Sequence, residues 1–241
     1  MTKLESANAV IDNIRSKTNE IGVFLSFGKD SLVILDMVYP KFDKVVCFYM
    51  YFLKNLEHMN RWINWAQARY PKIEIVQIPH WTLSYLLRSG LYCTPNPNVK
   101  LISLQDVVQS MRLKYNIEYM FLGMKMADGM NRRLMLKTYE SNLYENKGMV
   151  YPLAEWTQKE ILAYMKQHGL PEPVRYTIKK ASSGIGFNVE CLAWLEEHYP
   201  EDLLKIYEAY PISRRILFEY HYHEKMEQEQ LNNNEDEKVS N

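Results

Sequence analysis

A short polar segment directly after an apolar run contains the side chains best suited to chemistry in this chain. The segment reads Ser26-Phe27-Gly28-Lys29-Asp30-Ser31, and apolar residues at helical spacing follow it. The N–H groups at a helix start have no partners within the helix and attract anions. Around them the two serine hydroxyls can donate hydrogen bonds, Lys29 brings positive charge, and Gly28 lets a ligand approach the backbone. Asp30 is suited to holding a hydrated Mg²⁺ beside phosphates, so the segment predicts a phosphate-binding loop.

A second group of charged residues lies between residues 123 and 133, where Gly123 ends another apolar run. Gly123 precedes Lys125, Arg132 and Arg133, with the carboxylate of Asp128 among them. Arginine can hold phosphate oxygens through two parallel hydrogen bonds, whereas lysine acts as a point charge. The spacing favours a site for a polyanion or an adenylyl phosphate. The alternative interpretation is a solvated loop with a charged helix start.

The elements that must position these residues alternate between strand and helix. Apolar runs predict strands at 21–25, 45–50 and 119–122, and alternating apolar residues predict a strand at 73–78. Helical spacing predicts helices at 5–18, 32–38, 56–69 and 103–114, with a loop at 89–100. Strands separated by helices indicate an α/β fold with a doubly wound parallel sheet. Ligands of such sheets bind beyond the carboxyl ends of the strands, where both charged segments are expected to lie.

The rest of the chain is predicted to be mostly helical. Thr157 and Glu160 have the spacing of a capping box, and Gly169 ends that helix. A basic loop at 179–186 either folds over a phosphate or is a plain linker, and helices are expected at 189–198, 201–210 and 213–229. We therefore divide the chain into an α/β domain, 1–178, a small C-terminal helical extension, 179–229, and a polar acidic tail, 230–241, which we expect to be disordered.

The composition narrows the classes of function. The 241 residues carry 29 basic and 29 acidic side chains, and this net charge of zero does not indicate direct nucleic-acid binding. No apolar stretch has the length of a membrane span and no signal-peptide core is visible, so we expect a cytoplasmic protein. Cys47, Cys93 and Cys191 are far apart in the sequence, which disfavours a disulfide framework or a cysteine metal site.

The first polar segment resembles the PP-loop of the ATP pyrophosphatase superfamily, which has the pattern S-x-G-x-D/Q-S. Its Ser-Phe-Gly start is most similar to phosphoadenylyl-sulfate (PAPS) reductases, and its Gly-Lys-Asp-Ser is similar to the small subunit of sulfate adenylyltransferase. Two further segments resemble PAPS reductases in the same order. The Gly-x-Arg of those proteins corresponds here to Gly123-Met124-Lys125, with Arg132 at a later basic position. Residues 151–171 resemble a stretch that is largely architectural in that family, so we assign no chemistry to Trp156 or His168.

One departure from the family concerns its chemistry. PAPS reductases carry a C-terminal Glu-Cys-Gly-x-His motif whose thiolate attacks sulfur, whereas Glu190-Cys191 is followed here by Leu-Ala-Trp-Leu in a helical pattern. We therefore expect Cys191 to pack as a small hydrophobic residue. The cysteine clusters that hold iron–sulfur centres in some relatives are also missing from the sequence.

The resemblance implies an adenine nucleotide alpha hydrolase-like (HUP-type) fold that binds ATP, or PAPS, together with Mg²⁺. The residues implied in nucleotide binding are Ser26, Phe27, Gly28, Lys29, Asp30, Ser31, Gly123, Lys125, Arg132 and Arg133. Among these, Lys29, Lys125 and Arg132 are implied to be catalytic, and Asp30 is implied to be the metal ligand. We expect cleavage between the α and β phosphates and adenylylation of an acceptor that the sequence does not identify.

Two alternative functions remain open. In the first, the chain binds PAPS or adenylyl sulfate and releases sulfite with the help of an external thiol. In the second, it is a non-catalytic nucleotide-binding partner protein in a phage or mobile-element DNA-associated system. Its 18 tyrosines and its helical extension would then form a docking surface for another protein or for a second copy of the chain.

Overall fold

The sheet has six strands in the computed structural model, which describes residues 2–173, 188–223 and 226. The strands are β1 (Glu20–Phe24), β2 (Lys44–Tyr51), β3 (Ile73–Pro79), β4 (Met120–Phe121), β5 (Leu143–Tyr144) and β6 (Met149–Val150). Their order across the sheet is β3-β2-β1-β4-β6-β5, and neighbours run parallel except for the pair β5–β6. This arrangement confirms the predicted α/β fold. The antiparallel edge strand β5 is a feature that the sequence did not predict.

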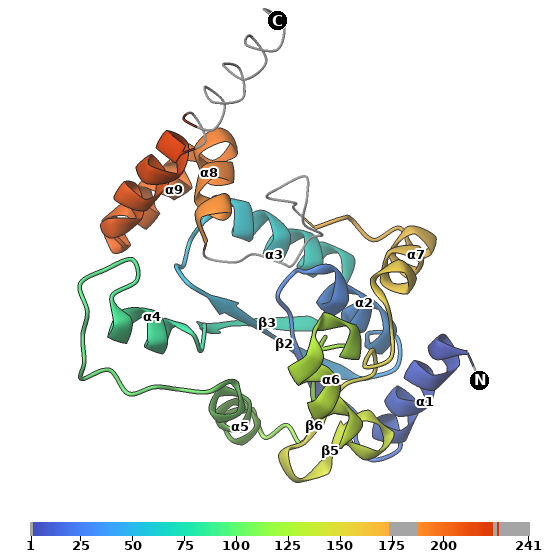
Figure 1. Ribbon diagram of the computed structural model, residues 1–241. Helices are drawn as coiled ribbons and strands as arrows, with labels where there is room; N and C mark the ends of the chain where they lie inside the picture. Colours follow the sequence, from blue (N-terminus) through green and yellow to red (C-terminus); the bar gives the residue numbers. More distant parts are fainter. Residues whose placement is uncertain (1, 174–187, 224–225, 227–241) are drawn as a thin grey trace, which may run out of the picture.

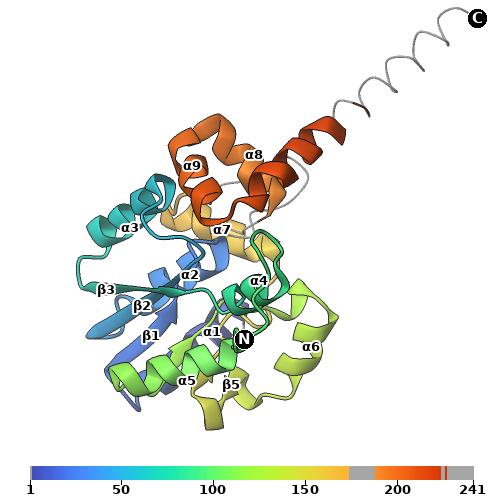
Figure 2. The same ribbon diagram turned by 90° about the vertical axis from the view of Figure 1, so that its left-hand side faces the viewer.

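Helices cover both faces of the sheet, as a doubly wound arrangement requires (Figures 1 and 2). They are α1 (Lys3–Arg15), α2 (Lys29–Val38), α3 (Glu57–Arg69), α4 (Leu83–Ser89), α5 (Leu104–Tyr115), α6 (Met130–Lys137), α7 (Gln158–His168), α8 (Val189–His198) and α9 (Pro200–Ala209), with short 3-10 turns η1 (Met126–Asp128), η2 (Glu140–Asn142) and η3 (Glu145–Lys147). Val23 of β1 packs in the core formed with α1, α2, α3 and α7, whereas Phe24 packs in the core formed with α5 and α6. The inner strands are therefore buried on both faces, which explains why they form continuous apolar runs in the sequence.

The helix that begins at the polar segment, α2, is fixed further along by a cluster of side chains around Asp36. The hydroxyls of Tyr70 and Tyr164 each donate a hydrogen bond of 2.9 Å to this carboxylate. His168 at the end of α7 places its Nδ1 2.9 Å from Asp36 Oδ2. Residues 151–171, which we expect to be architectural, therefore help to hold α2 in place.

The C-terminal helices pack into the same core as the sheet. Leu195 of α8 and Ile206 of α9 belong to the cluster around α2 and α3. Asp202 of α9 is fully buried and accepts hydrogen bonds from the backbone N–H groups of Glu57 and His58 at the start of α3. Burial would raise the pKa of Asp202, but these hydrogen bonds outweigh it and lower the pKa. A carboxylate from α9 thus caps α3, and Figure 2 shows α8 and α9 on the side of the molecule where α3 and α7 lie.

The predictions for the C-terminal part of the chain can be compared with the structure where its residues are described. The predicted helices at 189–198 and 201–210 are confirmed as α8 and α9, and residues 212–223 are helical where a helix was predicted from 213. The basic loop at 179–186 and the tail at 230–241 lie outside the described residues. Within the described part of the chain, no helix is long and apolar enough to cross a membrane.

Candidate functional site

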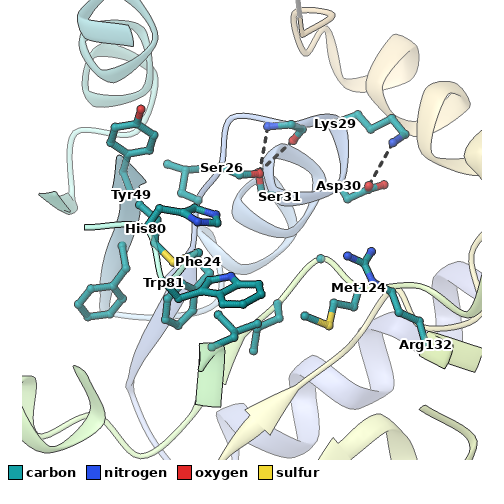
Figure 3. A pocket seen from close by; sticks show the side chains of 17 residues that line it. Phe24, Ser26, Lys29, Asp30, Ser31, Tyr49, His80, Trp81, Met124 and Arg132 are labelled. Atoms are coloured by element: carbon teal, nitrogen blue, oxygen red, sulfur yellow. Dashed lines mark hydrogen bonds and ion pairs between the residues drawn. The ribbon is translucent and has the colours of Figure 1, made fainter. Parts of the chain in front are cut away.

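A cavity of about 290 Å³ lies at the carboxyl ends of β1, β2, β3 and β4 (Figure 3). This is the position at which parallel sheets of α/β proteins usually bind ligands, and the volume is near the lower end of the range for small-molecule sites. The lining residues are Phe24, Leu25, Ser26, Gly28, Lys29, Asp30, Ser31, Phe48, Tyr49, Met50, His80, Trp81, Leu104, Leu122, Gly123, Met124 and Arg132.

Residues 26–31, here called the polar loop, form the turn between β1 and α2. The N–H of Gly28 donates a hydrogen bond of 3.3 Å to Ser26 Oγ, and Ser31 Oγ donates one of 3.0 Å to the carbonyl of Gly28. The two serine hydroxyls lie 3.2 Å apart. Gly28 is the residue that precedes α2, and it has no side chain that could cap the helix. N–H groups at a helix start lack partners within the helix, so the start of α2 suits an anion.

Phe27 determines the shape of the polar loop, and its side chain does not line the cavity. Its φ angle of 56° lies in the left-handed region, which is uncommon for any residue except glycine. The ring is buried and packs against Tyr49 and Trp62, with centroid distances of 5.6 and 6.1 Å. Gly28, in contrast, has ordinary extended angles. Packing of the Phe27 ring therefore holds the unusual backbone turn of the loop.

Five charged side chains, here called the charge cluster, lie beside the polar loop. They are Lys29, Asp30, Lys125, Asp128 and Arg132. The ammonium of Lys125 lies 2.7 Å from Asp30 Oδ2 and 2.9 Å from Asp128 Oδ1, and its side chain is only 2% exposed. Lys29 Nζ lies 3.2 Å from the same oxygen of Asp30. Three cations therefore alternate with two carboxylates across the polar loop and the segment after β4.

Asp128 is the residue that orders this segment. It accepts hydrogen bonds from the backbone N–H of Lys125, at 3.0 Å, and from Arg132 Nη1, at 2.7 Å. Partial burial would raise the pKa of Asp128, but the hydrogen bonds and charges of Lys125 and Arg132 outweigh it and lower the pKa. Gly129, with a φ of 153°, then provides the turn into α6. The sequence showed Asp128 among the cations, but the site predicted from it did not include this residue.

Gly123 allows the segment after β4 to approach the start of α2. A Cβ atom at this position would lie 3.0 Å from the Cβ of Asp30 and 3.3 Å from the backbone N of Ser31. These contacts are tighter than nearly all real Cβ contacts. The glycine is therefore needed for close approach of the two segments that carry the charges.

The other side of the cavity is aromatic. Phe24, Tyr49, His80 and Trp81, here called the aromatic wall, lie opposite Lys29, Asp30 and Arg132 (Figure 3). His80 and Trp81 directly follow β3, and the N–H of His80 donates a hydrogen bond of 2.8 Å to the carbonyl of Tyr51. The sequence-based site did not include the aromatic wall. Applying the carboxyl-end rule to the strand predicted at 73–78 would have indicated His80 and Trp81.

The predicted site residues are thus distributed as follows. Ser26, Gly28, Lys29, Asp30, Ser31, Gly123 and Arg132 line the cavity. Lys125 is buried next to Asp30, Phe27 packs in the core, and Arg133 is exposed and does not line the cavity.

Cys191 lies in the core and does not line this cavity. The residue is 2% exposed, as the helical apolar pattern around it predicts. It borders a separate void of about 20 Å³ together with Tyr49 and Met50, two residues that also line the cavity. The described structure therefore gives the thiol no open path to a molecule in the cavity.

Comparison with known proteins identifies the family. The phosphoadenosine phosphosulfate reductase domain matches residues 20–176, a range that includes the polar loop, the charge cluster and the segment that anchors α2. Because this match covers more than half of the sequence, the chain belongs to the phosphoadenosine phosphosulfate reductase domain family. No curated protein sequence is significantly similar to the chain.

Several solved structures are similar to the chain at low identity. A PAPS reductase from Candida auris in complex with phosphate is 16% identical, with a TM-score of 0.46, and the alignment covers 69% of this chain and 81% of that one. An NH3-dependent NAD synthetase from Campylobacter jejuni is 15% identical, with a TM-score of 0.46, over 92% of this chain and 96% of that one. The U34-tRNA thiolase NcsA from Methanococcus maripaludis is 14% identical, with a TM-score of 0.45, over 89% and 78% of the two chains.

Proposed function

We propose that this member of the family is an ATP-dependent enzyme that cleaves the bond between the α and β phosphates and adenylylates an acceptor. The observation that carries the proposal is the division of one cavity into a cationic end and an aromatic end. An adenine nucleotide has the same division, because its phosphates are charged and its base is flat and apolar on both faces. Family membership supports adenine nucleotides as the ligand class.

In this proposal the triphosphate lies on the polar loop. The N–H groups at the start of α2 and the hydroxyls of Ser26 and Ser31 would donate hydrogen bonds to phosphate oxygens. Arg132 is the most accessible cation of the charge cluster, with a side chain 49% exposed, and can hold two oxygens at once. The base would then lie against the aromatic wall, where stacking is favourable.

Asp30 would hold the Mg²⁺ that accompanies ATP. Its Oδ2 contacts Lys29 and Lys125, but its Oδ1 is buried without a hydrogen-bond partner among the described residues. A carboxylate oxygen in this state suits a cation, since Mg²⁺ commonly binds one or two carboxylates together with substrate phosphates. When bound, the ion would neutralise part of the charge of the triphosphate.

The chain itself would contribute positioning and charge neutralisation, which dominate catalysis of phosphoryl and adenylyl transfer. An acceptor oxygen attacks the α phosphorus, and the bond to the bridging oxygen breaks to release pyrophosphate. Negative charge then grows on the leaving group. Lys29 and Arg132 would stabilise this charge directly.

Calorimetric titration with Mg·ATP, followed by a pyrophosphate-release assay, tests the proposal. Wild-type protein should bind ATP and release pyrophosphate slowly even without the acceptor, and Arg132→Ala should weaken both. Lys137→Ala is a matched control, because this lysine is exposed on the same helix and does not line the cavity. Absence of ATP binding by the wild-type protein would refute the proposal.

A second candidate function is binding of PAPS or adenylyl sulfate, with sulfite released by an external thiol. The observation that favours it is the match to the PAPS reductase domain. Titration with PAPS under the same conditions separates the two functions. Tighter binding of PAPS without pyrophosphate release from ATP would select this candidate, and ATP binding without any turnover would favour a nucleotide-binding partner protein.

A further inference from the structure

His80 occupies a fixed position in the aromatic wall. Its backbone extends the pairing of β2 with β3 beyond the strand end, through the hydrogen bond to the carbonyl of Tyr51. The imidazole lies nearly parallel to the ring of Phe52, at 4.5 Å and 20°, and to Trp81, at 5.9 Å and 27°. Figure 3 shows the ring on the same side of the cavity as Tyr49 and Trp81. The ring therefore has little freedom to turn.

The contacts of Thr82 determine which nitrogen of His80 carries the proton. The backbone N–H of Thr82 points at His80 Nδ1, at 3.2 Å, and a peptide N–H can only donate. Thr82 Oγ1 lies 2.6 Å from the same nitrogen and can donate to it as well. Nδ1 is therefore an acceptor, and the hydrogen of the neutral ring is on Nε2. Burial lowers the pKa of His80 to about 4, so the ring is neutral at physiological pH.

His80 thus presents one N–H donor, and no described residue accepts a hydrogen bond from it. A donor on the wall of a cavity, next to flat aromatic surfaces, matches a planar ligand with a ring nitrogen that accepts hydrogen bonds. Purine bases have such acceptors at N1, N3 and N7. The phosphates are expected at the opposite, cationic end, where Lys29 and Arg132 lie.

We propose that His80 is a specificity-determining residue that donates a hydrogen bond from Nε2 to a ring nitrogen of the bound adenine. This inference rests on the proposed binding of an adenine nucleotide and adds the atom that recognises the base. Thr82 acts as a positioning residue, since it holds the tautomer that makes Nε2 a donor. A base without the matching acceptor would leave this donor unpaired in a partly buried place, which disfavours its binding.

The test compares His80→Gln with His80→Asn by calorimetric titration with Mg·ATP. Both variants lose the aromatic ring, but glutamine can place its amide N–H₂ near the position of Nε2, whereas the asparagine side chain reaches only the position of Nδ1. Because both variants lose the stacking equally, their difference reports the donor alone. His80→Gln should bind ATP about three- to tenfold more tightly than His80→Asn, the range that one neutral hydrogen bond contributes.

Deaza analogues of ATP identify the accepting atom. The wild-type protein is titrated with 1-deaza-, 3-deaza- and 7-deaza-ATP, each of which replaces one ring nitrogen by C–H. One analogue should bind the wild-type protein about three- to tenfold more weakly than ATP does, and it should abolish the difference between the two variants. Equal ATP affinities of the two variants, or a difference that survives with all three analogues, would overturn the role of His80 while leaving ATP binding intact. Failure of the wild-type protein to bind ATP would instead refute the proposed function, and this inference with it.

Discussion

Replacement of Lys125 by methionine tests whether the charge cluster is held together by one buried ammonium. Lys125 contacts Asp30 at 2.7 Å and Asp128 at 2.9 Å, and methionine fills a similar volume without charge. In the variant the two carboxylates face one another without the cation between them. We expect the protein to fold with a lower free energy of unfolding.

The contact distances allow the magnitude to be worked out. They leave the two facing oxygens at most about 5.6 Å apart, and at an effective dielectric constant of about 20 two unit charges at this separation repel by about 3 kcal/mol. Removing one partner of a buried ion pair costs about 3–5 kcal/mol, and these carboxylates are 20% and 22% exposed, which places the effect at the lower end. We therefore expect a loss of about 3 kcal/mol near pH 7.

The dependence of this loss on pH has a defined sign. The lowered pKa of Asp128 means that its carboxylate stabilises the wild-type fold above its unfolded pKa, and this stabilisation is lost as the pH falls through the folded pKa. In the variant, protonation of the Asp128 carboxyl relieves the repulsion. The difference between wild type and variant should therefore shrink as the pH falls from neutral toward about 4.

Urea unfolding at several pH values, followed by circular dichroism, measures the effect. The double variant Lys125→Met/Asp128→Asn removes one of the two facing charges and should recover about half of the loss at pH 7. Lys137→Met is the control, since substitution of this exposed lysine should change stability by less than about 0.5 kcal/mol. An unfolding free energy of Lys125→Met equal to that of wild type, or a double variant no more stable than the single one, would contradict the reasoning.

Four further outcomes are expected. Lys29→Ala should weaken Mg·ATP binding by about 1.5–3 kcal/mol in calorimetric titration, and unchanged affinity would remove this lysine from the site. Gly123→Ala should cost about 1–3 kcal/mol of stability in urea unfolding and weaken ATP binding, because the new methyl group would contact Asp30 at 3.0 Å; wild-type behaviour would show that the segment moves freely. Cys191→Ser should leave nucleotide binding and pyrophosphate release intact, since the thiol is buried; loss of activity in a folded variant would restore a thiol mechanism. The free energy of unfolding should fall as the pH drops from about 6.5 to 4, because unfolded chains bind the proton that folded His80 does not. His80→Asn should flatten this slope, and an unchanged slope would mean that another group causes it.

The fold could be predicted largely because the inner strands are buried on both faces. In an α/β chain, an apolar run such as residues 45–50 indicates a strand that is buried on both faces of the sheet. The helices between such runs indicate that neighbouring strands are parallel. Strands β5 and β6 have two residues each in the structure, too few for any period to be visible in the sequence. The antiparallel edge strand β5 was therefore missed. Its pairing with β6 is decided by contacts that only the folded chain makes.

The two ends of the cavity differed in how far the sequence could predict them. The polar loop is a local motif, so its residue types and spacing were sufficient to predict that Ser26, Lys29 and Ser31 lie together at the end of β1, where they line the cavity. The aromatic wall combines residues from β1, from β2 and from the segment after β3, which share no sequence pattern. For the same reason the ion pair between Lys125 and Asp30 was not foreseen, since the two residues are distant in the sequence.

The geometry also divides the cations by the way each can act on a phosphate. Arg132 is half exposed and is held by Asp128, so it can exchange a carboxylate oxygen for a phosphate oxygen at little cost in desolvation. Lys125 is buried between two carboxylates, and moving it to a ligand would remove the cation that lies between them. The positive charge of Lys125 nevertheless offsets the negative charge of Asp30, which belongs to the polar loop. Lys125 therefore suits the role of a fixed counter-charge that keeps the loop receptive to anions, whereas Arg132 suits direct contact with the nucleotide.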